Sequence, residues 1–315
     1  MHHQAKFIAT LACLGALPCV ADYSDTIIAA DPLAYYRLGE ASGTTAVNSA
    51  TGGNSIGVDG TYVGTFGLGA TSLVPTETDT ASTFSVANNS HVNIDNGAYE
   101  GTIDARSTEL WFKADDVSRG GGSPEKQVIW EEGGATRGLN IYVFNGQLYF
   151  HAWNANDGDA DTWGANNPTS AAQNGDGTAR AISTAINSGQ TYHAVIVYDD
   201  VGNATGDALD GTLTAYVNGV SIGGFNDVGR IFTHSDTAAI GRVSGTTLFH
   251  DDTVNGSTGS PGNEYFDGVI DDVSIYNYAL TSTQVLNHYN EGVPEPSSLA
   301  LLSLGGLLLA RRRRG

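Results

Sequence analysis

Cysteine and basic residues are both scarce in this chain of 315 residues. It has two cysteines, and 14 lysines and arginines against 34 aspartates and glutamates. Both cysteines, Cys13 and Cys19, lie near the amino terminus, so the rest of the chain can form neither disulfides nor thiolate metal sites. The two ends carry one acidic and five basic residues, which leaves residues 22–292 with 33 acidic and 9 basic side chains and a net charge of −24. Such a surface repels phosphate and argues against a nucleic-acid partner.

The sequence also lacks an apolar run long enough to cross a bilayer as a helix. The two longest runs, Phe7–Leu17 and Leu299–Ala310, have about 11 and 12 residues, against the roughly 20 that a span requires. The first run follows Lys6 and precedes Pro18 and a small-residue cleavage site, so residues 1–21 are predicted to be a signal peptide that signal peptidase removes. Neither cysteine follows a convincing lipobox, which disfavours a lipoprotein.

The carboxyl-terminal residues 293–315 read VPEPSSLALLSLGGLLLARRRRG. A rigid tetrapeptide, an apolar segment and a basic cluster follow one another, and the basic cluster holds such a tail at the cytoplasmic face. This arrangement resembles the PEP-CTERM sorting signal of bacteria that make exopolysaccharide. The resemblance implies an exosortase as partner, brief anchoring in the inner membrane, cleavage, and transfer to the cell surface or matrix; an ordinary tail anchor is the alternative. The residues that carry it are Val293, Pro294, Glu295, Pro296, Arg311, Arg312, Arg313 and Arg314.

Between these ends the sequence alternates with the period of a β-strand. In residues 107–116, Leu110 and Phe112 fall on one face, whereas Glu109 and Trp111 fall on the other. Further strands are predicted over 138–153 and 211–224, each with a turn at an Asn-Gly pair, and over 190–200 and 267–280. One helix is predicted over 282–290, because Thr281 and Gln284 form a capping box. High glycine content and few helix formers favour an all-β fold of two antiparallel sheets.

The order of these elements resembles a laminin-G-like domain of the concanavalin A-like lectin/glucanase superfamily. The matching segments are 30–52, 107–114, 191–199, 215–223, 240–242 and, most distinctively, FDGVIDDVSIYNYALTSTQVLNHY at 266–289. The resemblance implies a concanavalin A-like jelly roll over residues 22–292, with a concave face that often binds glycans. This fold hosts enzymes, lectins and structural modules, so it does not fix an activity.

Residues for glycoside hydrolysis are missing from the pattern. A retaining glycosidase needs two carboxylates on one face of a strand, about 5–5.5 Å apart. Glu131 and Glu132 are adjacent and so predicted on opposite faces, and the same holds for Asp271 and Asp272. A G-x-S-x-G match at residues 53–57 has no helix after it and is a chance match. No catalytic residue is therefore assigned, and the protein is predicted not to be an enzyme.

Calcium is the metal that the sequence favours. If residues 36–40 belong to a first strand, alternation places Tyr36 and Glu40 on one face of it. It likewise places Asp271 and Val273 on one face of the last long strand, 267–280. If these strands pair, the two carboxylates meet, and a hard cation relieves their repulsion. In this superfamily a structural calcium often joins the first and last strands, and Asp272 is the alternative ligand. Solvation, or pairing with arginine or backbone amides, is the other explanation. A second acidic stretch at 154–167 fails the EF-hand pattern.

Aromatic side chains are the candidates for carbohydrate binding, because a ring can stack on the apolar face of a sugar. The alternative for each is packing in the core or at its rim. The candidates are Trp111, Tyr142, His151, Trp153 and Trp163. Together these features predict an exported carbohydrate-binding protein. A structural or adhesive matrix module and an atypical polysaccharide hydrolase or lyase are the alternatives.

Overall fold

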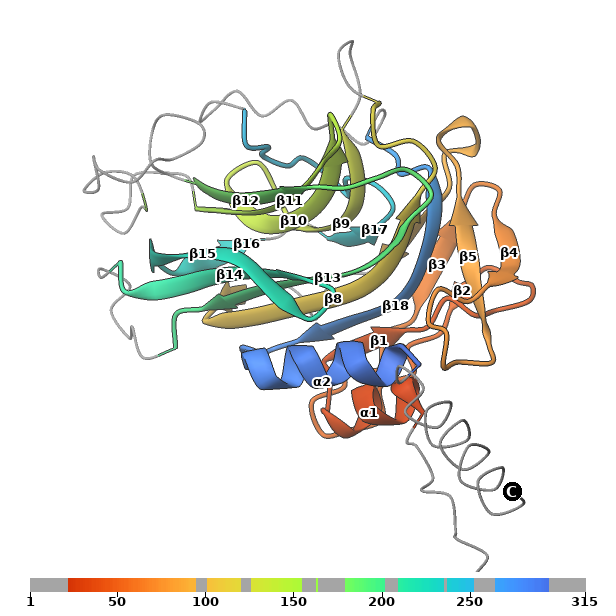
Figure 1. Ribbon diagram of the computed structural model, residues 1–315. Coiled ribbons are helices and arrows are strands. Elements are labelled where there is room, and N and C mark those ends of the chain that lie inside the picture. The colour runs from red at the N-terminus through yellow and green to blue at the C-terminus, as the bar shows by residue number, and fades with distance from the viewer. Residues whose placement is uncertain are drawn as a thin grey trace, which may run out of the picture.

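Two antiparallel sheets stacked face to face form the body of the protein, as Figure 1 shows for the computed structural model. The structure describes residues 22–94, 101–119, 126–154, 163, 179–201, 209–234, 237–251 and 264–294. The all-β fold class and the two-sheet architecture are therefore confirmed.

Sheet I has the strand order β15-β14-β13-β8-β18-β5-β4, with β1 also paired to β18. Its strands are β1 (Ala34–Tyr36), β4 (Gly67–Thr71), β5 (Thr80–Phe84), β8 (Ala105–Ala114), β13 (Thr191–Asp199), β14 (Gly211–Val217), β15 (Val220–Val228) and β18 (Gly268–Tyr276). Strands β1 and β18 are antiparallel neighbours, which is the pairing that the predicted calcium site requires.

Sheet II has the strand order β12-β11-β10-β9-β17-β6-β3-β2. Its strands are β2 (Thr45–Ala46), β3 (Gly60–Val63), β6 (His91–Ile94), β9 (Gln127–Gly133), β10 (Arg137–Phe144), β11 (Gln147–Asn154), β12 (Ala179–Ala185) and β17 (Ala238–Ile240). A separate pair joins β7 (Gly101–Ile103) to β16 (Ile231–His234).

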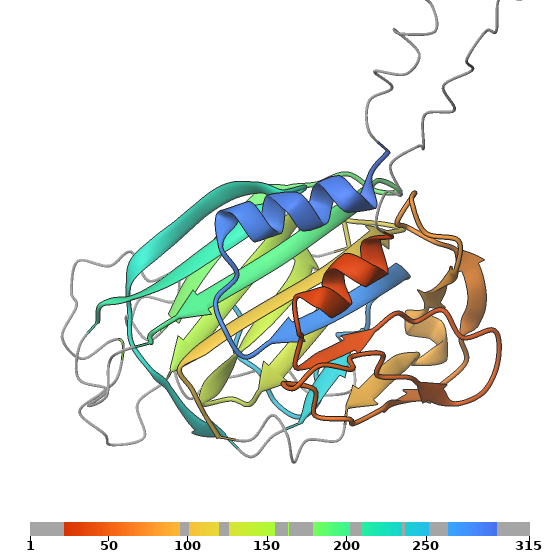
Figure 2. The same cartoon turned by 90° about the horizontal axis from the view of Figure 1, so that it is seen from below.

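The main core lies between the two sheets and follows the alternation of the strands. In β8, Leu110 and Phe112 point into this core, together with Ile141 of β10 and Phe150 of β11. The opposite face of β8, which carries Glu109 and Trp111, is also buried, because two helices cover the outer face of sheet I (Figure 2). The alternation of apolar and polar residues therefore predicts correctly which way each β8 side chain points. It does not predict that helices cover the outer face.

Helix α2 (Ser282–Gly292) confirms the predicted helix, and Thr281 and Gln284 form its capping box. Helix α1 (Tyr23–Ala29) is not predicted by the sequence. At seven residues it is too short to be stable by itself, so the burial of Tyr23 and Ile27 against sheet I holds it in place. A short 3₁₀ turn spans Val86–Asn88.

Both predicted Asn-Gly hairpins are confirmed. The β10–β11 turn has Asn145 at φ 49° and Gly146 at φ 74°, and the β14–β15 turn has Asn218 at φ 51° and Gly219 at φ 76°. Two successive positive φ values match the right-handed twist of a hairpin, and glycine adopts them without steric strain.

We expect Gly146→Ala to lower the free energy of unfolding by about 1–2 kcal/mol, from the cost of a left-handed backbone alone. A Cβ atom at Gly146 meets nothing within 4 Å, so no clash contributes. Gly53→Ala is the matched control, because Gly53 also has open space but no positive φ. Urea unfolding of both variants measures the difference, and equal stabilities would contradict the strained turn.

The predicted tags lie mostly outside the described residues, which begin at Asp22 and end at Pro294. Within the described part of the chain, neither helix is long and apolar enough to span a membrane.

Candidate functional site

Three of the predicted glycan-binding residues lie together on the outer face of sheet II. Tyr142 of β10 and His151 and Trp153 of β11 alternate with core residues and so share that face. All three are fully buried. Residues 243–251, here called the covering segment, lie over them: His151 Nδ1 is 2.9 Å from the Leu248 carbonyl oxygen, and Tyr142 Oη is 2.6 Å from His250 Nδ1. Burial lowers the pKa of His151 to about 3, so this ring is neutral.

Beside them the side chains become partly exposed. We call Lys126, Phe144, Tyr149, His250 and Asp251 the aromatic cluster. The Tyr149 ring stacks on Tyr142 of the next strand at 4.9 Å and on His250 at 4.1 Å between ring centroids. This cluster therefore presents ring surface at the edge of the covered face, where a ligand can reach it.

The aromatic cluster contains one ion pair, between Lys126 and Asp251. Lys126 Nζ lies 2.5 Å from Asp251 Oδ1 and 4.7 and 5.1 Å from the ring centroids of Phe249 and Phe144. Burial alone would raise the pKa of Asp251, but Lys126 more than offsets this and the pKa is lowered. The cluster thus combines aromatic rings with a carboxylate and an ammonium group, which can exchange hydrogen bonds with hydroxyl groups.

The other two predicted aromatic residues lie elsewhere. Trp111 is 2% exposed beneath α1 and α2, where its ring packs against Tyr23 and Tyr289. Trp163 lies in the main core, stacks on Tyr198, and donates from Nε1 to the Arg230 carbonyl at 3.1 Å. The placement of both matches the packing alternative, and neither belongs to the face that carries Tyr142.

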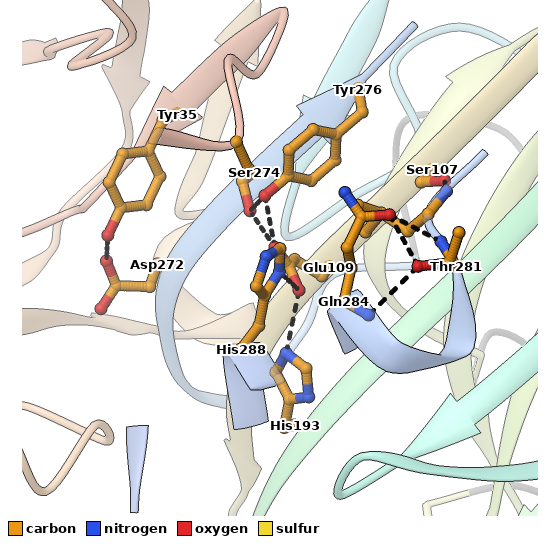
Figure 3. Close-up of polar contacts among 12 residues, drawn as sticks. Tyr35, Ser107, Glu109, His193, Asp272, Ser274, Tyr276, Thr281, Gln284 and His288 are labelled. Atoms are coloured by element: carbon orange, nitrogen blue, oxygen red, sulfur yellow. Dashed lines mark hydrogen bonds and ion pairs between the residues drawn. The ribbon is translucent and has the colours of Figure 1, made fainter. Parts of the chain in front are cut away.

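A buried polar network lies beneath α2, and the sequence does not predict it (Figure 3). The Glu109 carboxylate accepts hydrogen bonds from Ser274 Oγ at 3.1 Å and Tyr276 Oη at 2.5 Å. His288 Nδ1 of α2 lies 2.9 Å from Glu109 Oε1, and His193 Nε2 lies 3.3 Å from Oε2. The network joins three strands of sheet I to the helix.

Electrostatics make this network a structural ion pair. Burial alone would raise the pKa of Glu109, but His288 and His193 lower it well below the ordinary range. Burial alone would lower the pKa of His288, but Glu109 raises it. A carboxylate and an imidazole that favour each other's charged forms, both shielded from solvent, hold elements together rather than reach a substrate. The period-two pattern places Glu109 on this face of the sheet. It does not predict the ion pair, because the partner His288 comes from the helix that covers the face.

A β-bulge brings the Asp271 and Asp272 carboxylates to the outer side of sheet I. The register between β18 and β8 shifts between Asp271 and Ser274, and Asp272 has φ 50°. Asp271 Oδ2 accepts from Leu73 N at 2.7 Å, while Asp272 Oδ1 accepts from the Tyr35 hydroxyl. The prediction that Asp271 shares a face with Val273 is wrong, because Val273 points into the main core. The prediction that Asp271 and Asp272 lie on opposite faces is also wrong, because the bulge turns both carboxylates outward.

Burial raises the pKa of both carboxyl groups. Asp271 reaches about 7, and the pKa of Asp272 is raised further above its ordinary value by the neighbouring Asp271 charge. One oxygen of each, Asp271 Oδ1 and Asp272 Oδ2, is buried without a hydrogen-bond partner. Two unpartnered carboxylate oxygens fit a hard cation, which would relieve their repulsion.

Glu40 is not part of this pair. Strand β1 ends at Tyr36, and Leu38 has φ 59°, so the alternation that aligns Glu40 with Tyr36 breaks down. The Glu40 carboxylate instead accepts from Val47 N at 2.8 Å and from the Tyr62 hydroxyl at 2.7 Å. In the part of the chain that the structure describes, no group of three or more acidic, histidine or cysteine side chains is arranged for a metal ion.

The remaining acidic side chains follow the sequence analysis in part. Glu131 accepts from Ser244 N on the outer side of sheet II, whereas Glu132 pairs with Arg106 of sheet I at 2.7 Å. These adjacent glutamates therefore lie on opposite faces, as predicted. The acidic stretch at 154–167 falls outside the described residues, apart from Asn154 and Trp163.

Comparison with protein families gives two matches. A family model described as the concanavalin A-like lectin/glucanases superfamily (Laminin_G_3) matches residues 86–286. A second, described as the PEP-CTERM protein-sorting motif, matches residues 292–314. No match was found among curated proteins.

Solved structures share the fold at low sequence identity. Domain 4 of AbnA, an extracellular GH43 arabinanase from Geobacillus stearothermophilus in complex with arabinotriose, is 16% identical with a TM-score of 0.51, over 82% of this chain and 98% of that one. A structure of botulinum neurotoxin type C, whose cell entry depends on two ganglioside molecules, is 10% identical with a TM-score of 0.53, over 85% and 52%. The binding domain of botulinum neurotoxin DC with SialylT is 12% identical with a TM-score of 0.51, over 84% and 52%. The chain spans about half the length of these neurotoxin chains, and the likenesses concern the fold alone.

Proposed function

The chain belongs to the concanavalin A-like lectin/glucanase superfamily, and on that premise we propose that it binds carbohydrate through the aromatic cluster as an exported protein. Its PEP-CTERM motif indicates export and sorting at the bacterial membrane. The proposed destination is the cell surface or the extracellular matrix, after an exosortase has processed the tail.

The observation that carries this proposal is the partly exposed ring surface of Tyr149 beside Lys126 and Asp251. A pyranose offers an apolar face to a ring and hydroxyl groups at its rim. Tyr149 stacks on Tyr142 and His250, which fixes its orientation, so little side-chain entropy is lost when a sugar packs against the part of the ring that stays exposed. Asp251 can accept from hydroxyl groups, and its side chain is 44% exposed.

The positions of the carboxylates support binding over hydrolysis. A glycosidase requires two carboxyl groups that flank a bound sugar. The closely spaced acidic groups Asp271 and Asp272, and the Glu109 network, lie beneath α1 and α2 and are fully buried. Among the residues that the structure describes, Asp251 is the one acidic side chain of the partly exposed cluster, and Lys126 engages it.

We expect Tyr149→Ala to weaken retention on the glycan that the protein binds by about tenfold, or ~1.4 kcal/mol. Tyr149→Phe is the matched control. This variant keeps the ring and removes only the hydroxyl, which has no hydrogen-bond partner among the described residues, so we expect it to retain binding. A glycan array with the wild-type protein identifies the ligand, and affinity electrophoresis in that polysaccharide then compares the variants.

The outcomes separate the alternatives. Binding by the wild type that both variants retain would place the sugar elsewhere on the body. A wild type that binds no glycan, together with loss of cell-surface integrity when the protein is missing, would support a structural module. Release of reducing ends or unsaturated products from a polysaccharide would support an enzyme.

We further propose that Asp271 and Asp272 can hold one calcium ion. Their two unpartnered oxygens are the support for this. Calcium takes six to eight oxygen ligands, which carbonyl groups and water can complete. The bound ion would fasten the bulge of β18, and would take no part in binding sugar, because the aromatic cluster lies on the other sheet.

A further inference from the structure

The two ends of the described chain meet at one place on the body. Tyr23, at the start of α1, and Val293, just after α2, pack in the same apolar cluster with Trp111. Both helices lie on the outer face of sheet I (Figure 2). The predicted signal peptide and the sorting tail therefore join the body side by side.

The last turn of α2 is fixed firmly to the body. A Cβ atom placed on Gly292 would lie 2.6 Å from Trp111 Cζ2 and 3.2 Å from Tyr23 Cδ2. The Thr76 hydroxyl also donates to the Glu291 carbonyl at 2.7 Å. Because Gly292 is held so closely, the body determines where Pro294 and the sorting motif begin.

Only a short stretch of chain separates this point from the apolar tail segment. Five residues lead from Pro294 to Leu299, and at about 3.3–3.6 Å per residue they reach at most about 18 Å. We propose that, while the tail is in the membrane, the body stands with one defined face against the lipid surface. This anchor face consists of α1, the last turn of α2 and residues 72–77.

The acidic character of the anchor face indicates that the tail alone holds the body at the membrane. Asp25 of α1 is exposed, Glu291 is partly exposed, and residues 22–292 carry a net charge of −24. Anionic lipid headgroups attract basic segments and repel acidic ones. The body therefore leaves the membrane once the tail is removed.

This orientation turns sheet II away from the membrane. The helices lie below sheet I in Figure 1, and the covering segment lies on the outer face of sheet II. A ligand can therefore reach that side of the body before the tail is cleaved. The inference rests on the fold and the sorting motif and not on carbohydrate binding.

Cysteine labelling tests the orientation, because residues 22–292 contain no cysteine. Asn290→Cys places a thiol on an exposed position of the anchor face, and Thr246→Cys places one on an exposed position of the covering segment. Both are made in the full chain with Cys13→Ala and Cys19→Ala. Each is added to preformed vesicles of phosphatidylethanolamine and phosphatidylglycerol, and floated protein is labelled with a bulky polyethylene glycol maleimide.

We expect labelling of Asn290→Cys to be slowed about fivefold or more in vesicles relative to detergent, because the reach of five residues leaves little room for the reagent. Thr246→Cys should react at the same rate in both. A flexible Gly/Ser linker of about twelve residues, inserted after Pro294, should restore labelling of Asn290→Cys. Equal rates at Asn290→Cys in vesicles and detergent, equal protection at both positions, or failure to float would each overturn the proposal.

Discussion

Replacing Glu109 by alanine is expected to lower the free energy of unfolding by about 3–5 kcal/mol, the cost of removing one partner of a buried ion pair. His288 would lose its counter-ion, and the Tyr276 hydroxyl would lose its acceptor at 2.5 Å. Both groups are buried, so water cannot replace the lost partner without opening α2. Urea unfolding followed by circular dichroism measures the change.

Glu291→Ala is the matched control for this substitution. Glu291 is a partly exposed side chain in α2 and lies outside the buried network around Glu109, so we expect a change within about 0.5 kcal/mol. Glu109→Gln keeps the shape of the side chain and should cost less than alanine. A stability loss in Glu109→Ala no larger than that in Glu291→Ala would show that the network does not hold the helix.

The same network predicts a pH window for this stabilisation. The folded pKa of Glu109 lies below its ordinary 4.5, so its contribution is present above 4.5 and is lost as the pH falls through the folded value. The folded pKa of His288 lies above 6.5, so its contribution is complete below 6.5 and is lost as the pH rises through the folded value. The pair therefore stabilises the protein most between pH 4.5 and 6.5. In His288→Ala the loss of stability above pH 6.5 should disappear.

Asp272→Asn is expected to stabilise the protein at pH 8 in calcium-free buffer, with a much smaller effect at pH 4. Both carboxyl groups of the pair have folded pKa values above the ordinary 3.8. The stability that they contribute is complete below 3.8 and is lost as the pH rises, through about 7 for Asp271. Asparagine cannot ionise and still accepts from the Tyr35 hydroxyl, and the contact that it gives up, from Arg37 Nε to Asp272 Oδ1, is long at 3.9 Å.

Thermal unfolding at both pH values, with chelator and then with added calcium, measures this effect. Asp115→Asn is the control, because Asp115 is exposed and its side chain makes no contact with the pair. If calcium raises the melting temperature of the wild type but not of Asp272→Asn, the two carboxylates share the ion. Destabilisation by Asp272→Asn in the presence of chelator would contradict the unfavourable burial of this charge.

The sequence predicts the sheets well because their residues alternate and their turns carry Asn-Gly pairs. Strand β8 shows the limit of that reasoning. Alternation places Trp111 and Glu109 on one face, but the same pattern arises for a face in water and a face under helices. Helix α1 is missed because its seven residues offer too little periodicity, and its stability comes from contacts far away in sequence.

The candidate site could be predicted only in part for a related reason. Tyr142, His151 and Trp153 share a face because β10 and β11 form a simple hairpin. The covering segment lies about a hundred residues later in the chain, and no local sequence pattern predicts that it packs on this face. The pairing of Glu40 with Asp271 fails at Leu38 and at Asp272, where single residues with positive φ change the register.

The close approach of Tyr23 and Val293 has a consequence for engineering. A short peptide could join residue 22 to residue 294 and close the body into a ring, and the exposed Asn145 turn offers a place to open that ring elsewhere. In such a circular permutant the new ends would emerge from the β10–β11 turn, so that a fused surface anchor would hold the same body by a different point.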